Sequence, residues 1–221
     1  MIQAILFDMD GTLVDSVDLH AEAWQRAFAK FGREVTLNQA RALIGKGADQ
    51  FLSDYFGPEE LARVEDDINE YRADIFRRDY LPEVRPFPGV RDLFERIVAD
   101  GKRIALVSSS NQADLREYQK IAGIADLLDA ATSADDAERS KPHPDIFHAA
   151  LRRLGNPDPR TVVAIGDTPY DVIAAGKAGL PTVGVLCGGF GEVHLREAGC
   201  VALYADPADL LAHYDDSPLA G

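Results

Sequence analysis

The sequence has little cysteine, few basic residues and no long hydrophobic run. Only two of its 221 residues are cysteines, Cys187 and Cys200, and they form no Cys-x-x-Cys pair. Nothing requires a disulfide, because a chain of this length buries on the order of 70% of its unfolded surface without covalent staples. We expect both cysteines to be small buried hydrophobic side chains in a reducing compartment.

The shortage of basic residues argues against a nucleic-acid partner. The 23 Lys and Arg stand against 37 Asp and Glu, which gives a formal net charge of −14. A protein that binds phosphate backbones gathers Lys and Arg on one face, and no such cluster occurs here. The densest charged run is acidic and is expected to be a solvated helix face; it comprises Glu59, Glu60, Glu65, Asp66, Asp67 and Glu70.

No apolar run has the length of a membrane span. The first run, residues 2–7, meets Asp8 and Asp10 directly, and it is too short and lacks the basic lead of a signal peptide. Charged residues make up 27% of the chain and hydrophobic residues 46%, as in ordinary globular proteins. The sequence predicts a cytoplasmic protein without a membrane partner.

Short apolar runs alternate with helical periodicity over most of the chain. The expected strands cover residues 2–7, 104–107, 127–131, 162–165 and 182–186, and the expected helices cover residues 90–97, 115–121, 146–154 and 170–178. Such alternation is typical of a parallel sheet covered on both faces. It predicts an α/β fold with a doubly wound, Rossmann-like core.

An all-helical segment interrupts this alternation after the first strand. Apolar residues recur every three or four positions over residues 17–31, behind Asp15 or Ser16 as a cap, and over residues 61–75; residues 40–56 are mostly helical, apart from Gly45-Lys46-Gly47. Three prolines between positions 82 and 88 mark a hinge. We expect a core of residues 1–14 and 85–221, an inserted helical domain of residues 15–84, and a frayed tail over residues 215–221.

Two pairs of carboxylates follow strands. Asp8 and Asp10 point to the same side at the end of the first strand, where ligands of open α/β sheets bind. A tight turn would explain Asp10 with Gly11, but it gives no reason for Asp8. Asp167 ends another strand and Asp171 follows in the next helix, where a helix cap is the alternative. Both pairs at one sheet edge predict an oxygen-rich pocket that suits Mg²⁺.

Donors follow two further segments. The strand at residues 104–107 leads into Ser108-Ser109-Ser110-Asn111, close to a helix start that favours anions. Ser110 or Asn111 as a plain helix cap is the alternative, and it does not need Ser108. Lys141 stands before another helix, where a lone lysine is usually solvated.

Together these segments resemble the haloacid dehalogenase superfamily of phosphohydrolases. Asp8-Met9-Asp10-Gly11-Thr12 is similar to its first motif, Ser108 to its second, Lys141 to its third, and Gly166-Asp167 with Asp171 to its fourth. The resemblance covers about residues 2–185. The helical segment resembles the cap domain of the branch that contains phosphoglycolate phosphatase and β-phosphoglucomutase.

The resemblance implies a role for each motif. Asp8 would attack phosphorus and become a transient aspartyl phosphate, and Asp10 would act as general acid and then general base. Ser108 would hydrogen-bond the phosphoryl group, and Lys141 would offset negative charge. Mg²⁺ would be held by the carboxylates of Asp8 and Asp167 and by the backbone carbonyl of Asp10, with Asp171 in a supporting position. An acid at position 10 also points to phosphate esters, because dehalogenases and phosphonate-cleaving members lack it.

A phosphatase is favoured over a β-phosphoglucomutase-like mutase. His20 resembles a histidine in the hinge of that mutase, or else is an ordinary residue beside an apolar stripe. Gly166 stands where the mutase has an acid, and the loop around Lys46 lacks the expected phosphate-binding arginine. Lys46 could fold over the substrate or be solvated.

The sequence thus predicts a Mg²⁺-dependent phosphomonoesterase that acts on a small phosphorylated metabolite of the sugar-phosphate or phosphoglycolate type. The side chains expected to bind this substrate are His20, Lys46, Ser109 and Asn111. A phospho-signalling receiver, the alternative from another class, needs neither the Asp8-x-Asp10-Gly11-Thr12 motif nor a helical insert. The chain is expected to be a monomer or a weak dimer.

Overall fold

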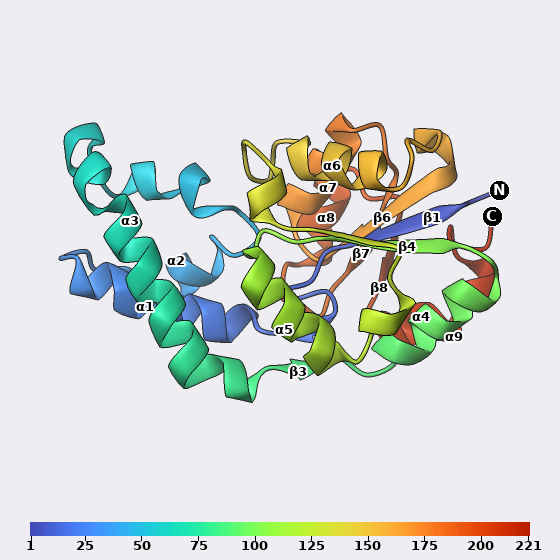
Figure 1. Cartoon of the computed structure of the whole chain (residues 1–221), viewed down its shortest axis with the longest axis horizontal. Helices are drawn as coiled ribbons and strands as arrows, with labels where there is room; N and C mark the ends of the chain where they lie inside the picture. Colours follow the sequence, from blue (N-terminus) through green and yellow to red (C-terminus); the bar gives the residue numbers. More distant parts are fainter.

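A six-stranded parallel sheet forms the centre of the computed structural model, which describes residues 1–221 (Figure 1). The strand order is β5-β4-β1-β6-β7-β8. The strands are β1 (Ala4–Phe7), β4 (Arg103–Val107), β5 (Ala130–Thr132), β6 (Val162–Gly166), β7 (Thr182–Val185) and β8 (Ala202–Tyr204). The central strand β1 pairs in parallel with both β4 and β6, so the carboxyl ends of all three strands meet at one edge.

Helices cover both faces of the sheet, as the doubly wound prediction requires. Ile5 and Phe7 of β1 join one hydrophobic cluster with residues of α4 (Val90–Ala99), α5 (Gln112–Ala122) and α9 (Pro207–Ala212). Ala4 and Leu6 join another cluster, with residues of α6 (Asp145–Arg153) and α7 (Pro169–Lys177). Successive side chains of a strand point to opposite faces, and this alternation divides the core between the two clusters.

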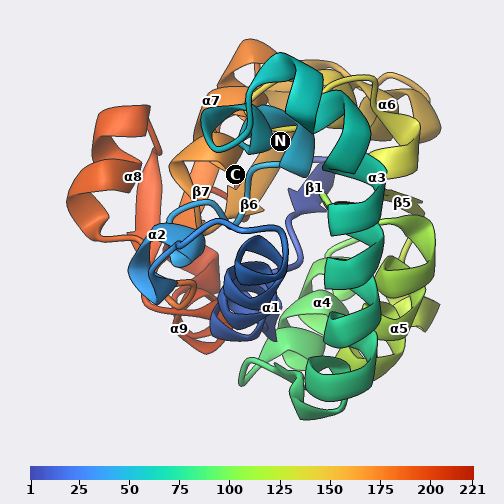
Figure 2. The same ribbon diagram turned by 90° about the vertical axis from the view of Figure 1, so that its left-hand side faces the viewer.

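The inserted segment is helical and has its own core. It contains α1 (Val17–Lys30), α2 (Leu37–Arg41) and α3 (Pro58–Ile75), which continues into a π-helical turn at Phe76–Tyr80. Figure 2 shows α1 and α3 in front of the end of the sheet. Thirteen buried residues, from Val17 to Ile68, form a third hydrophobic cluster within this segment. A two-stranded antiparallel ribbon, β2 (Val14–Asp15) with β3 (Arg85–Pro86), joins it to the sheet.

Four expectations differ from the structure. The prediction of a strand at residues 127–131 is wrong at its start, because Ala125–Leu127 is a 3₁₀ turn and β5 begins at Ala130. Strand β8 and helix α8 (Glu192–Ala198) were not predicted, because their sequence patterns are short. Residues 40–56 hold only the end of α2 and two 3₁₀ turns. The tail is not frayed, because Leu219 is fully buried and its carbonyl accepts from Lys102 Nζ at 2.5 Å.

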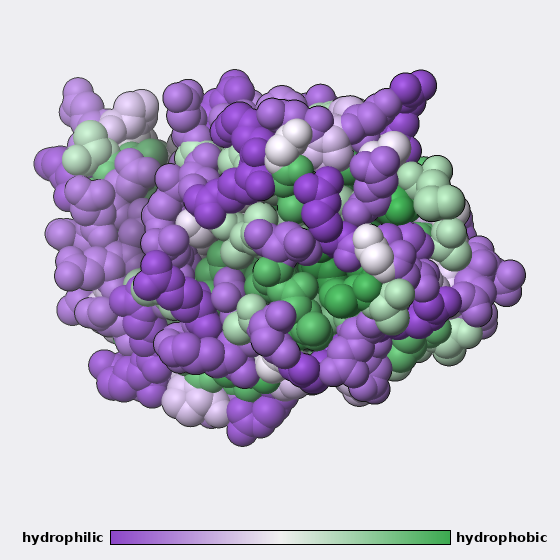
Figure 3. All heavy atoms as spheres, turned by 45° about the vertical axis from the view of Figure 1, so that its right-hand side comes forward, coloured by the Kyte–Doolittle hydropathy of each residue, from purple (hydrophilic) through white to green (hydrophobic).

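The surface is predominantly polar. On the face drawn in Figure 3, charged and polar residues surround a central apolar area, and smaller apolar areas lie toward the edges. The two cysteines are free and half-buried. No helix combines the length and the apolar composition that crossing a membrane requires.

Candidate active site

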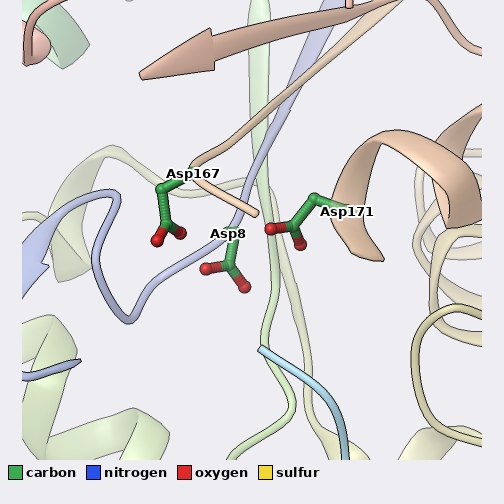
Figure 4. Close-up of side chains that lie close together, drawn as sticks. All are labelled: Asp8, Asp167 and Asp171. Carbon is green, nitrogen blue, oxygen red and sulfur yellow. The ribbon is translucent and has the colours of Figure 1, made fainter. Parts of the chain in front are cut away.

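Three buried aspartates meet at the carboxyl edge of the sheet. Asp8 directly follows β1, Asp167 follows β6, and Asp171 lies in the first turn of α7. One carboxylate oxygen from each lies within 4.8 Å of the other two (Figure 4). The side chains come from segments more than 150 residues apart in sequence, and the parallel pairing of β1 with β6 brings them together.

The sequence around these aspartates leaves room for their approach. A Cβ atom on Gly166 would lie 2.5 Å from the Cβ of Asp171, so glycine is required for this contact. Gly11 has a φ of +79°, and a side chain there would collide with Asp167. Thr168 caps α7 in a capping box with Asp171, whose Oδ2 accepts from the Thr168 hydroxyl at 2.6 Å. The helix-cap alternative is therefore correct for Asp171, and its other oxygen still faces the pocket.

Lys141 lies between two of these carboxylates. Its Nζ contacts Asp8 Oδ1 and lies 2.7 Å from Asp171 Oδ1, and only 1% of its side chain is exposed. Burial alone lowers the pKa of this lysine, but the adjacent charges of Asp171 and Asp8 raise it above its usual value. Lys141 is therefore a permanent cation inside the pocket and not a solvated loop residue.

The three aspartates still carry more negative charge than Lys141 offsets. Burial raises the pKa of Asp8 to about 7, against the opposing effect of Lys141. Burial and then the neighbouring Asp171 and Asp8 raise the pKa of Asp167 well above its usual range. Asp167 Oδ2 is also buried without a hydrogen-bond partner. Excess charge, an orphaned oxygen and an all-oxygen donor set fit Mg²⁺.

Asp10 lies beside this cluster and is held as a carboxylate. Its Oδ1 accepts from the Ser16 hydroxyl at 2.7 Å and lies 3.0 Å from His20 Nε2, and its Oδ2 accepts from the Ser110 hydroxyl at 3.1 Å. Burial by itself raises the pKa of Asp10, but His20 and the hydroxyl donors outweigh it and lower the pKa to about 2. Ser16, expected as a helix cap, makes no side-chain cap bond, and its hydroxyl donates to Asp10 instead.

His20 is buried and fixed in orientation. Its ring stacks on Phe76 with centroids 3.9 Å apart, and its Nε2 lies 2.9 Å from the Tyr118 hydroxyl as well as near Asp10. The sequence analysis did not find Tyr118, because it has the spacing of an ordinary core position in α5. His20 thus contacts a residue of the expected site rather than only flanking an apolar stripe.

The segment after β4 lines the same pocket. Ser108 is fully buried and its hydroxyl accepts from the Ser110 backbone N–H at 3.1 Å. Ser109 lies on the cavity wall. Asn111 is the N-cap of α5, accepting from the Asp114 N–H at 2.9 Å, and it also borders the cavity. The helix-cap alternative therefore holds for Asn111.

A cavity of about 470 Å³ lies between the sheet edge and the helical insert, lined by Asp8 and Asp10 from the sheet side. Lys46 lines the opposite side, with its Nζ 5.5 Å from the centroid of the Tyr170 ring. Arg72 of α3 also lines it and was missed by the sequence analysis. The available signal was its position four residues after Ile68 and three before Ile75, both buried on the inner side of α3.

The family model for haloacid dehalogenase-like hydrolases matches residues 5–185. The chain belongs to this family. It is 28% identical to a phosphorylated carbohydrates phosphatase of Thermotoga maritima, over 95% of this chain and 97% of that protein. It is 34% identical to the chloroplastic protein SUPPRESSOR OF QUENCHING 1 of Arabidopsis thaliana, over 90% of this chain. The chain spans only 19% of that plant protein.

The fold is shared with solved structures. The crystal structure of a hydrolase from Pseudomonas syringae superposes with a TM-score of 0.87 at 27% identity, covering 97% of this chain and 99% of that one. The family match and the phosphatase relatives place the chain among phosphoric monoester hydrolases. The α/β core with its helical insert is the fold expected from the sequence.

Proposed function

We propose that the protein is a Mg²⁺-dependent phosphatase that hydrolyses a small phosphorylated metabolite through an aspartyl-phosphate intermediate. The observation that carries the proposal is the cluster of Asp8, Asp167 and Asp171 around Lys141. Phosphoryl transfer needs positioning and neutralisation of the phosphoryl oxygens, which this cluster can supply. The match to the family of haloacid dehalogenase-like hydrolases and the similarity to a phosphatase support the assignment.

Asp8 is the proposed nucleophile. Its carboxylate oxygen attacks phosphorus, a new P–O bond forms, and the bond between phosphorus and the ester oxygen breaks. Asp10 donates a proton to the departing oxygen, and in the second half it takes a proton from the water that attacks the acyl phosphate. Inorganic phosphate leaves and Asp8 is regenerated. Ser108 and Lys141 would hold the phosphoryl oxygens through both halves.

The protonation state of Asp10 depends on the groups beside its carboxylate. With its present partners Asp10 has a pKa lowered to about 2, so it is ionised, which is the protonation state that the second half requires. In the first half it must carry a proton. A phosphoryl dianion within hydrogen-bond reach raises the pKa of a neighbouring carboxyl group, because like charge disfavours its ionised form. The substrate itself would thus convert Asp10 into the acid.

Asp8, Asp167 and Asp171, with the backbone carbonyl of Asp10, would hold Mg²⁺. When bound, the ion neutralises phosphoryl charge and orients the group for in-line attack. The orphaned Asp167 Oδ2 is the atom most clearly lacking a partner.

The helical insert is proposed to act as a cap domain. Residues 15–84 would move against a core of residues 1–14 and 85–221, with the β2-β3 ribbon as the hinge. In the present arrangement the Tyr170 hydroxyl donates to the Ala42 carbonyl at 3.0 Å, which joins α7 to the insert. Such closure excludes water while Asp8 attacks phosphorus. No observation specifically favours the mutase.

The test is release of inorganic phosphate from a panel of phosphorylated metabolites, with Mg²⁺ and with EDTA. Turnover that requires Mg²⁺ and disappears in the Asp8→Asn variant supports the proposal. Isomerisation of a sugar phosphate only with added bisphosphate, and no phosphate release, would replace it with the mutase.

A further inference from the structure

Arg72 faces the cavity without a partner. Its guanidinium carbon lies 5.2 Å from the centroid of the Trp24 ring, and its Nε atom is buried with no hydrogen-bond acceptor. Burial lowers the pKa of this guanidinium, because desolvation disfavours the charged form. Arg72 as a whole is half-buried, and a buried donor without an acceptor destabilises the folded chain, so its retention points to a ligand that pairs with this side chain.

The two aspartates whose charges attract Arg72, Asp114 and Asp10, already accept hydrogen bonds from other groups. Asp114 accepts from Arg77 Nε at 2.7 Å on one oxygen and from Asn111 Nδ2 at 2.8 Å on the other. Asp10 accepts from two hydroxyl groups and lies against His20. Neither carboxylate forms an ion pair with Arg72, although both attract it. Arg72 therefore lines the cavity with no carboxylate paired to its guanidinium.

The cavity connects Arg72 to the reaction centre. Asp8 and Asp10 line it on the core side, and Arg72 with Trp24 lines it on the side of the insert. A metabolite whose phosphoryl group meets Asp8 would extend its other end toward α3. There the flat Trp24 ring supports the guanidinium, whose fork fits two oxygens of one anionic group better than a single hydroxyl.

We propose that Arg72 determines specificity by pairing with a second anionic group, a carboxylate or a second phosphate, on the leaving group of the substrate. This inference rests on the proposed phosphatase function and narrows its substrate class. Neutral sugar monophosphates would leave the guanidinium unpaired and would therefore be poorer substrates.

The test compares matched substrates. Phosphoglycolate is set against its neutral amide, a sugar bisphosphate against the corresponding monophosphate, and p-nitrophenyl phosphate serves as a substrate without a second anion. Wild-type kcat/KM should favour the anionic member of one pair by about 10- to 100-fold, the range of a charged hydrogen-bonded pair. The pair that shows the preference identifies carboxylate or phosphate.

Substitutions at Arg72 assign the preference to its side chain. Arg72→Met should abolish the preference and Arg72→Lys should retain part of it, where the preference is the ratio of the two kcat/KM values within each substrate pair. Arg63→Met is the control, since Arg63 is exposed on the same helix. A preference that survives in Arg72→Met, or no preference in the wild type, overturns the inference.

Binding without turnover separates this inference from the proposed function. Trp24 is the only tryptophan, so its fluorescence reports on ligands beside Arg72. The Asp8→Asn variant is titrated with the same pairs. A response to the anionic member that Arg72→Met removes supports the inference even if the wild type hydrolyses nothing. Equal responses to both members of each pair overturn it even if the phosphatase assay succeeds.

Discussion

One buried lysine balances the acidic pocket. Lys141 comes from a loop with no predicted structure of its own, yet it contacts Asp8 and Asp171 in the interior. A buried ion pair adds little stability against an apolar replacement of both partners, but loss of one partner leaves an uncompensated charge. The lysine is therefore needed by the fold as well as by the proposed chemistry.

The Lys141→Met variant tests whether the fold and the proposed chemistry both need this lysine. Removing one partner of a buried pair costs about 3–5 kcal/mol, which for a chain of this size lowers the melting temperature by about 6–20 °C. Phosphatase activity should fall below detection. Calorimetry without Mg²⁺ measures the first effect. Lys177→Met is the control, because Lys177 is exposed and donates only to the Pro142 carbonyl. An unchanged melting temperature would contradict the prediction.

The raised pKa values of the carboxylates predict a pH-dependent stability. The pKa of Asp8 rises from 3.8 to about 7, and the pKa of Asp167 is raised as well. The folded chain therefore binds protons more tightly than the unfolded chain. These groups therefore stabilise the metal-free fold less as pH rises from 3.8 to about 7. The melting temperature of the wild type, minus that of Asp167→Asn, should decrease over this range.

Bound Mg²⁺ should reverse this loss of stability with rising pH. An ion at 100 times its dissociation constant stabilises the folded state by about 2.7 kcal/mol, and it should do so in the wild type near pH 8 but far less in Asp167→Asn. Melting curves at several pH values, with EDTA or with Mg²⁺, measure both effects. A difference between the two proteins that does not vary with pH would argue against buried, proton-binding carboxylates.

At the scale of elements, the start of α7 connects helix capping to the proposed metal site. Asp171 belongs to the capping box of Thr168 and also faces Lys141. A second capping box, formed by Thr36 and Gln39 at the start of α2, is exposed and remote from the pocket. The two boxes can therefore be compared directly, because only the box at α7 contains a carboxylate of the proposed metal site.

Thr168→Ala and Thr36→Ala should differ in metal affinity. Each loses a cap worth about 1 kcal/mol. Loss of a group that orients a metal ligand weakens metal binding by about 10-fold or more, so only Thr168→Ala should need more Mg²⁺ for half-maximal activity. Titration of activity with Mg²⁺ measures this. Equal Mg²⁺ requirements would show that Asp171 keeps its position without the box.

At the scale of the whole molecule, the insert and the core share one cavity. Besides the bond from Tyr170 to Ala42, the Ser140 backbone N–H donates to Asp49 at 3.3 Å. Asp49 and Lys46 belong to the loop that follows α2, and Ser140 precedes Lys141. The insert therefore meets the core beside the reaction centre, and a residue of the insert can affect substrate binding.

Lys46→Ala is expected to weaken substrate binding. A half-exposed cation contributes at most about 1 kcal/mol to an ion pair, so KM should rise by about 2- to 5-fold with kcat nearly unchanged. Steady-state kinetics with the best substrate of the panel measures this. Lys30→Ala, which removes an exposed charge on α1, should leave both constants unchanged. Identical kinetics for the two variants would exclude Lys46 from substrate contact.

The sequence by itself determined the sheet and the positions of the four motif segments. Asp8 and Asp167 could be placed at strand ends because apolar runs and helical periodicity are local signals. In a parallel sheet such ends share an edge, so their proximity follows from topology alone. The signals failed where elements are short, as in β8, and in the loop after α2, where Gly45 has a φ of +97° and no room for a side chain beside Thr168.

Only the tertiary structure decided which side chains have partners. Asn111 and Ser16 both resemble helix caps in sequence, yet one caps α5 and the other bonds Asp10. Arg72 and Arg77 both belong to the helical segment that begins with α3, yet Arg77 donates to Asp114 while the Nε atom of Arg72 has no acceptor. Hydrogen bonds between distant segments produce no periodic pattern in the sequence. Only the folded structure therefore shows which charged side chains lack a partner and can bind a ligand.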